Sequence, residues 1–176
     1  VRLHDNNAEN LAKGLKVIEG NYARTVSKGR LTQEAMDKRM SLIIPTENFD
    51  DLGDADVVIE AVYENLDLKK EIFAKLDKVM KPGALLATNT SGLDVDAIAN
   101  MTSRPEFVCG MHFFSPANVM RLLEVVRGDA SSPATLGTAM ALGKRFGKVS
   151  VMAGNCPGLI GNRRSGGYSR TVRSMI

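Results

Sequence analysis

The stretch Val57–Ser91, VVIEAVYENLDLKKEIFAKLDKVMKPGALLATNTS, contains a strand, a helix and a second strand in succession. Residues 57–59 are a short β-branched run, which is typical of a buried strand. Apolar residues then recur at helical spacing at Leu68, Ile72, Leu76 and Val79. Pro82 and Gly83 end that helix, and residues 84–88 form the next apolar strand. This unit predicts two parallel strands joined by a crossover helix.

The same alternation extends in both directions from this unit. On the N-terminal side we expect a strand over 1–5, a helix with an apolar stripe from Leu11 to Val26, a helix from about Thr32 to Met40 and a strand over 42–44. On the C-terminal side we expect helices over 95–101 and 133–146, and strands over 107–111, 122–126 and 149–152. The fold class is therefore α/β, a doubly wound, mostly parallel sheet of the Rossmann type with a protruding helical hairpin.

A cluster of proline and glycine at 154–158 follows the last predicted strand and indicates a domain boundary. Gly154, Gly158 and Gly161 do not have the spacing of a dinucleotide-binding loop, so we interpret them as a domain junction. We expect an incomplete dinucleotide-binding domain over 1–154, and over 155–176 a junction with the start of a C-terminal helical domain. The chain does not begin with Met and opens inside a strand. We therefore expect a piece of a longer protein, with a first strand and glycine-rich turn before it and most of the helical domain after it.

Composition narrows the class of protein. Of the 176 residues, 44% are hydrophobic and 24% are charged, which is enough to bury a normal core. A net charge of +3 is too small to indicate nucleic-acid binding, and no apolar run reaches the roughly 20 residues that a membrane span needs. Cys109 and Cys156 form neither a disulfide framework nor a metal-ligand pattern. We therefore expect no metal site and a reducing, intracellular compartment.

Asp5 stands at the end of the first predicted strand. An acid at this place in a dinucleotide-binding fold accepts hydrogen bonds from the adenosine ribose hydroxyls. Its charge would repel the 2′-phosphate of NADP and therefore favours NAD. An ordinary helix-capping role is the alternative interpretation.

His112 follows the predicted strand 107–111, at a strand end where open α/β sheets bind ligands. Histidine can take a hydroxyl proton near neutral pH while hydride leaves the same carbon. Glu124 lies within the apolar strand 122–126, so its carboxylate needs a partner. A chain reversal through Pro116 would bring Glu124 beside His112, as the carboxylate that orients a catalytic base. A structural buried ion pair is the alternative interpretation.

Two further strand ends are followed by polar or exposed positions. These positions are Asn89, Thr90 and Ser91 after the strand 84–88, and Ala61, Val62, Glu64 and Lys69 after the strand 57–59. The first group can hold a hydroxyl or carbonyl oxygen, and a turn with a helix cap is the alternative. In the second group, Ala61 and Val62 would approach a cofactor, and for Glu64 and Lys69 the alternative is a surface ion pair on the first helical turn.

Together these motifs resemble the 3-hydroxyacyl-CoA dehydrogenase family. The similar stretches are 57–76, which opens with VVIEAVYENL, then Thr88–Ser91, His112–Val125 and the segment GLIGNR at 158–163. The resemblance covers about residues 1–163 with continuous spacing. It implies the reversible oxidation of L-3-hydroxyacyl-CoA to 3-ketoacyl-CoA with NAD, in fatty-acid β-oxidation.

The resemblance also implies a role for each candidate residue. His112 would be the catalytic base and Glu124 its orienting carboxylate, while Ser91 and Asn162 would hold the reacting oxygen or the substrate. Asp5 would bind the adenosine ribose, and Glu64, Lys69 and Asn89 would lie along the nicotinamide side of the cofactor. Lys28 and Asn21 of the helical hairpin would meet the phosphates of coenzyme A. Ser115 would line the substrate site, and a serine there resembles the forms found in multifunctional β-oxidation proteins.

The same resemblance implies partners for the whole protein. They are an acyl-CoA substrate, a fused enoyl-CoA hydratase domain and a second copy bound through the C-terminal domain. The location would be cytoplasmic in a bacterium, and otherwise peroxisomal or mitochondrial. A dehydrogenase for a small β-hydroxyacid, or a non-catalytic fragment that binds nucleotide or acyl-CoA, stays open as an alternative. Because no glycine-rich phosphate-binding turn is in this sequence, we expect the isolated chain not to turn over.

Overall fold

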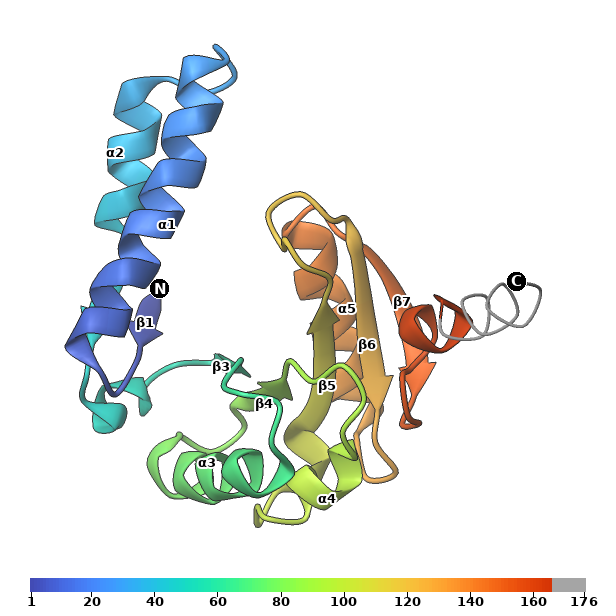
Figure 1. Cartoon of the computed structure of the whole chain (residues 1–176). Helices are drawn as coiled ribbons and strands as arrows, with labels where there is room; N and C mark the ends of the chain where they lie inside the picture. Colours follow the sequence, from blue (N-terminus) through green and yellow to red (C-terminus); the bar gives the residue numbers. More distant parts are fainter. Residues whose placement is uncertain (166–176) are drawn as a thin grey trace, which may run out of the picture. The chain divides into compact units, whose positions relative to one another are not determined.

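The computed structural model describes residues 1–165 of the chain. The chain forms two compact units, the first over Val1–Asp54 and the second from Ala55 onward (Figure 1). The predicted domain boundary at residue 154 stays a prediction. Residues 166–176 of the predicted C-terminal segment lie outside the described residues.

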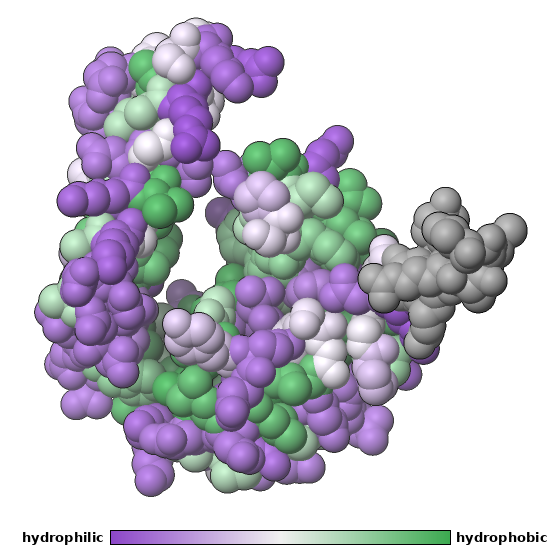
Figure 2. Space-filling model, in the orientation of Figure 1, coloured by the Kyte–Doolittle hydropathy of each residue, from purple (hydrophilic) through white to green (hydrophobic). Residues whose placement is uncertain are grey.

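In the first unit, a helical hairpin separates the two strands of a small parallel sheet. Its elements are β1 (Arg2–His4), α1 (Ala8–Ser27), α2 (Gln33–Ser41), β2 (Ile44–Thr46) and the 3₁₀ turn η1 (Phe49–Leu52). Asn7 caps α1 by accepting hydrogen bonds from two main-chain amides at 2.9 and 3.0 Å, and Thr32 caps α2. The two helices lie side by side, and the face of the hairpin in view is mostly hydrophilic (Figure 1, Figure 2). The predicted pair of helices is confirmed.

The strand β2 begins two residues later than the predicted strand over 42–44. Leu42 is instead the C-cap of α2, and the strand runs through Pro45. The parallel pairing uses the amide of Ile44 and the carbonyl of Thr46, which bond to the chain around β1 at 2.9 and 3.4 Å. Because Pro45 lies between these bonding positions, its missing N–H costs no hydrogen bond of the ladder.

The second unit is built on a five-stranded sheet with the order β3-β4-β5-β6-β7. Its elements are β3 (Val57–Glu60), α3 (Leu66–Val79), β4 (Leu85–Thr88), α4 (Val95–Ala99), the 3₁₀ turn η2 (Pro105–Phe107), β5 (Val108–Phe113), β6 (Leu122–Arg127), α5 (Pro133–Arg145) and β7 (Val149–Gly154). Neighbouring strands are parallel except β5 and β6, which are antiparallel. The predicted alternation and the mostly parallel sheet are confirmed.

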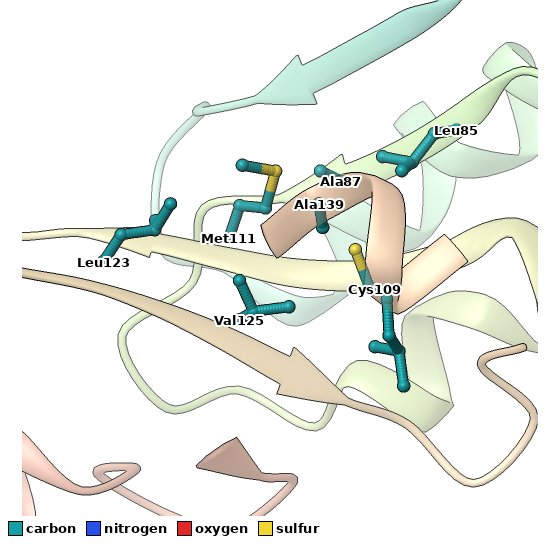
Figure 3. Close-up of a cluster of buried hydrophobic side chains, with 8 residues drawn as sticks. Leu85, Ala87, Cys109, Met111, Leu123, Val125 and Ala139 are labelled. Carbon is teal, nitrogen blue, oxygen red and sulfur yellow. The ribbon is translucent and has the colours of Figure 1, made fainter. Parts of the chain in front are cut away.

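One face of this sheet packs against α5. Buried apolar side chains of β4, β5 and β6 meet the helix there: Leu85, Ala87, Cys109, Met111, Leu123, Val125, Leu136 and Ala139 (Figure 3). Each fully buried leucine, valine or methionine side chain contributes roughly 1.5–3 kcal/mol to folding. Burial raises the pKa of the Cys109 thiol to about 12, so Cys109 stays protonated and packs as a small apolar side chain.

The opposite face of the sheet contains two buried polar residues. Successive side chains of a strand point to opposite faces, so His112 and Glu124 lie on the face away from α5. Apolar residues of α4, β6 and β7 pack together on that face. The strand β5 extends to Phe113, two residues beyond its predicted end at 111, because its pairing with β6 continues to Leu123.

Candidate active site

His112 and Glu124 are directly opposite each other in the antiparallel pair of β5 and β6. Nδ1 of His112 lies 2.7 Å from Oε2 of Glu124. The glutamate is fully buried, and only 7% of His112 is exposed. Residues opposed in this way have Cβ atoms about 4.5–5.5 Å apart, so the strand register itself produces the contact. The predicted hydrogen bond between the two side chains is confirmed.

This pairing fixes where the imidazole holds its hydrogen. A carboxylate only accepts, so Nδ1 donates to Glu124 and the neutral ring keeps its lone pair on Nε2. The ring of Phe114 packs beside the imidazole, with the two centroids 4.5 Å apart. His112 is therefore arranged as a proton acceptor whose protonated form the carboxylate stabilises.

The second carboxylate oxygen of Glu124 is bound by main-chain amides from a distant part of the chain. The amides of Ile160 and Gly161 each donate to Oε1 at 2.9 Å. A helix begins at Gly161, so amides at its N-terminus face the carboxylate. Sequence reasoning missed this contact because main-chain donors have no residue signature. The available signal was the pair of glycines at 158 and 161, which fits a domain junction equally well.

A second polar cluster joins the ends of β3 and β4. Oε1 of Glu64 accepts hydrogen bonds from the Thr90 hydroxyl at 2.7 Å, the Ser91 amide at 2.7 Å and the Ser91 hydroxyl at 2.9 Å. Partial burial alone would raise the pKa of Glu64, but these bonds and the charge of Lys69 outweigh it and lower that pKa. The Ser91 hydroxyl donates to Glu64 here, and rotation about its C–O bond would let it donate to a ligand oxygen instead.

Lys69 is fully buried, and its ammonium contacts two carboxylates. Nζ lies 2.7 Å from Oε1 of Glu60 and 3.7 Å from Oε2 of Glu64. The other oxygen of Glu60 accepts from the Thr88 hydroxyl at 2.7 Å. The alternative interpretation of Glu64 and Lys69 as a surface ion pair is therefore wrong. The buried Glu60 at the end of β3 binds the lysine on the inside of the protein.

The remaining candidates of the second unit lie at or after strand ends. Oδ1 of Asn89 accepts the amide of Phe113 at 2.9 Å, which ties the end of β4 to the end of β5. Asn162 is exposed in the first turn of the helix that begins at Gly161. Ala61, Val62 and Ser115 are exposed as well. The contacts join His112, Glu124 and the turn next to Asn162 in one cluster, and Glu64, Lys69 and Ser91 in another.

Three candidates belong to the first unit. Oδ1 of Asp5 accepts the amide of Asn7 at 2.9 Å, and Asn7 is the residue that caps α1. The alternative interpretation of Asp5 as the helix cap is therefore wrong. Asn21 is half-buried within α1, and Lys28 is exposed at its C-cap. The roles assigned to these three residues stay predictions.

Among residues 1–165, no group of three His, Cys, Asp or Glu side chains is arranged to hold a metal ion. Within the same part of the chain, no helix is both long enough and apolar enough to cross a membrane. Cys109 and Cys156 are both thiols, the first buried and the second half-buried.

An open α/β sheet with a buried histidine–glutamate pair is an arrangement that suits a dehydrogenase of the dinucleotide-binding class. The model of one family, 3-hydroxyacyl-CoA dehydrogenase, NAD binding domain, matches residues 1–156. The chain therefore belongs to the 3-hydroxyacyl-CoA dehydrogenase family, and the resemblance seen in the sequence is confirmed.

Two relatives and one solved structure illustrate the similarity. The chain is 64% identical over 113 residues to a peroxisomal bifunctional enzyme of Danio rerio, a match that covers 64% of this chain and 16% of that enzyme. It is 42% identical over 175 residues to the peroxisomal fatty acid beta-oxidation multifunctional protein AIM1 of Arabidopsis thaliana, over 99% of this chain and 24% of that protein. The crystal structure of FadB2 from M. tuberculosis matches with a TM-score of 0.95 at 32% identity, over 99% of this chain and 62% of that chain. The chain thus spans about a quarter or less of the length of these two relatives.

Proposed function

We propose that the protein containing this chain reversibly oxidises L-3-hydroxyacyl-CoA to 3-ketoacyl-CoA with NAD, in fatty-acid β-oxidation. The observation that carries the proposal is the buried pair of His112 and Glu124, with Nδ1 bonded to the carboxylate at 2.7 Å. Membership of the family and relatives named for peroxisomal β-oxidation support the same reaction.

In the oxidation, carbon 3 of the substrate loses a hydride and its hydroxyl group loses a proton, which converts the alcohol into a ketone. NAD, when bound, supplies the acceptor for the hydride. Nε2 of His112 takes the hydroxyl proton, and the ring becomes an imidazolium. Glu124, already bonded to Nδ1, stabilises that positive charge. A positioned base of this kind contributes about 10²–10⁴-fold to the rate.

The polar groups after the strands suit NAD. Glu64 and Ser91 follow β3 and β4, at the carboxyl ends of parallel strands where open α/β sheets bind dinucleotides. The carboxylate of Asp5 follows β1 and accepts one amide, which leaves acceptor capacity for ribose hydroxyls. We assign Asp5 to the adenosine ribose, and Ala61, Val62, Glu64 and Asn89 to the nicotinamide side, with the buried Lys69 acting through Glu64.

Further candidate residues are assigned to the substrate. Ser91 and Asn162 would hold the reacting oxygen, and Ser115 would line the acyl group. Asn21 lies in α1 and Lys28 is its C-cap, seven residues further on, which is about two helical turns along the same side. This spacing supports their assignment to the phosphates of coenzyme A.

The proposal extends to the whole protein. Relatives named bifunctional and multifunctional support a fused second enzyme, which we propose to be an enoyl-CoA hydratase. We further propose a dinucleotide-binding domain over 1–154, followed by a helical domain that pairs two copies of the protein. In a eukaryote the location would be peroxisomal or mitochondrial, and in a bacterium cytoplasmic.

The reaction is tested by following NADH consumption with acetoacetyl-CoA as the substrate of the whole protein. We expect His112→Gln to lower kcat by about 10²–10⁴-fold, because it removes the proton acceptor. His4→Gln is the matched control, since His4 is the only other histidine in the chain and packs on Phe49. Equal kcat for the two variants would contradict the role of His112. Free acetoacetate reduced as fast as acetoacetyl-CoA would instead indicate a dehydrogenase for small β-hydroxyacids.

A further inference from the structure

The two oxygens of Glu124 accept from two different parts of the protein. Oε2 accepts from His112, and Oε1 accepts from the amides of Ile160 and Gly161. Glu124 is fully buried, so water cannot replace a donor that is lost. The orientation of the carboxylate, and through it of the imidazole, therefore depends on a turn that lies 36 and 37 residues further along the chain.

The glycine at 161 allows this turn to approach the carboxylate. A Cβ atom at that position would lie 2.7 Å from Cζ and 3.1 Å from Cε1 of Phe114. The same ring packs beside the imidazole of His112, with centroids 4.5 Å apart. A side chain at 161 would therefore displace either Phe114 from His112 or the Gly161 amide from Glu124.

The turn before Gly161 is anchored in the protein interior. Gly158 and Leu159 both have positive φ, at 75° and 49°, which reverses the chain in a short space. Leu159 is fully buried among apolar residues of α4, β6 and β7. A Cβ atom at Gly92 would lie 2.8 Å from the amide nitrogen of Gly158, so the loop after β4 also packs against this turn. These contacts fix the position from which the amides reach Glu124.

We propose that Gly161 is a positioning residue, and that the helical turn beginning there sets the orientation of His112 through Glu124. The inference rests on the proposed function for the use made of His112. Asn162, which we assign to the reacting oxygen, is the next residue of the same turn. One turn thus orients the imidazole of His112 and carries Asn162, the residue assigned to the reacting oxygen. A displacement of the turn would therefore move both groups relative to the substrate.

Gly161→Ala in the whole protein tests this inference. Gly154→Ala is the matched control from the same segment, because a Cβ atom there meets nothing within 4 Å. We expect kcat for acetoacetyl-CoA reduction to fall about 100-fold in Gly161→Ala, since a displacement on the order of 1 Å at a reacting group has that effect. KM for NADH and the kcat of Gly154→Ala should stay at the wild-type values. Equal kcat in the two variants would overturn the inference.

The ring nitrogens of His112 provide a readout that a merely structural role of Gly161 would not change. ¹⁵N NMR of the labelled imidazole shows which nitrogen holds the hydrogen. We expect it on Nδ1 in the wild type and in Gly154→Ala, and no longer fixed there in Gly161→Ala. A Gly161→Ala protein that loses kcat but keeps the wild-type tautomer would overturn the inference. Because this measurement needs no substrate, it supports or overturns the inference even if the wild type does not reduce acetoacetyl-CoA.

A double variant tests the steric cause and remains informative if Gly161→Ala folds poorly. Adding Phe114→Leu removes the ring atoms that the new Cβ atom would meet. We expect the double variant to have a higher kcat than Gly161→Ala and to approach that of Phe114→Leu alone. A double variant no more active than Gly161→Ala would overturn the inference.

Discussion

Two buried carboxylates of the second unit differ in the groups that donate to them. Glu60 accepts from the ammonium of Lys69 and the hydroxyl of Thr88, each at 2.7 Å. Glu124 accepts from two amides and from His112, the type of side chain that gains or loses a proton near neutral pH. Glu60 therefore has a structural role. Glu124, by contrast, is bonded to an imidazole ring that becomes positively charged in the proposed proton transfer.

Glu124→Gln is expected to lower kcat by roughly 10³–10⁴-fold while the protein stays folded. A neutral amide cannot stabilise the imidazolium of His112, and its NH₂ group can turn toward Nδ1 and favour the wrong tautomer. Acetoacetyl-CoA reduction and a thermal melt measure the two quantities. Glu106→Gln, at an exposed position, is the control. Unchanged turnover in Glu124→Gln would remove the mechanistic role of the pair.

Glu60→Gln is expected to lower the free energy of unfolding by about 3–5 kcal/mol, because it leaves the ammonium of Lys69 buried without its main carboxylate. Urea denaturation measures the change. Glu71→Gln is the contrast, since it breaks the exposed pair with Lys75 and should have little effect. Equal losses in the two variants would show that burial does not set the strength of the Glu60–Lys69 interaction.

Among the secondary-structure elements, those with strong periodicity could be predicted from sequence, and errors occurred where tertiary pairing set the limits. The helices α1 and α3 have clear apolar stripes and definite caps, so their positions were predictable. The strand β2 includes Pro45, which local propensity excludes and which only the partner strand makes acceptable. The His112–Glu124 contact was predictable because His112 follows one recognisable strand and Glu124 lies within the next. The contacts of the Ile160 and Gly161 amides with Glu124 were not predictable, because main-chain N–H groups occur at nearly every residue and give no side-chain signal.

The C-terminus of α3 is bound by a side chain from a later loop. Arg104 donates to the carbonyls of Met80 and Lys81 at 3.1 and 2.8 Å and to the carboxylate of Asp77 at 2.8 Å. Burial alone would raise the pKa of Asp77, but hydrogen bonds from Ser103 and Arg104 outweigh it and lower that pKa from its ordinary value of 3.8. The helix end and the loop before β5 are thus joined by one ion pair.

Asp77→Asn is expected to lower the free energy of unfolding by about 1–3 kcal/mol at neutral pH. Since the folded-state pKa lies below the unfolded value, the stabilisation is complete above about pH 5 and is lost as the pH falls through the folded-state pKa. Chemical denaturation of both proteins at about pH 7 and about pH 3 should therefore show a smaller difference in acid. Asp129→Asn, at an exposed position, is the control. A difference between Asp77→Asn and the wild type that does not change with pH would contradict this prediction.

For the molecule as a whole, the residues assigned to NAD are divided between the two units. Asp5 belongs to the first 54 residues, while Glu64 and Asn89 belong to the second unit. The family match extends over both, through residue 156. Cofactor preference therefore tests the assignment of Asp5 separately from the assignments in the second unit.

The whole protein is expected to prefer NADH to NADPH, because the carboxylate of Asp5 beside a 2′-phosphate would pair like charges. Comparison of kcat/KM for the two cofactors measures this preference. Asp5→Ser should narrow the difference, whereas Asp37→Ser, on the exposed surface of α2, should leave it unchanged. A wild-type preference for NADPH would show that Asp5 has no part in cofactor selection.

The antiparallel register of β5 and β6 has a consequence for how this protein can diverge. His112 and Glu124 face each other because of strand pairing, so the segment between Ser115 and Arg121 does not set their separation. Insertions and deletions in that exposed segment can accumulate without disturbing the pair. The histidine–glutamate pair can therefore persist while this loop changes in length and sequence.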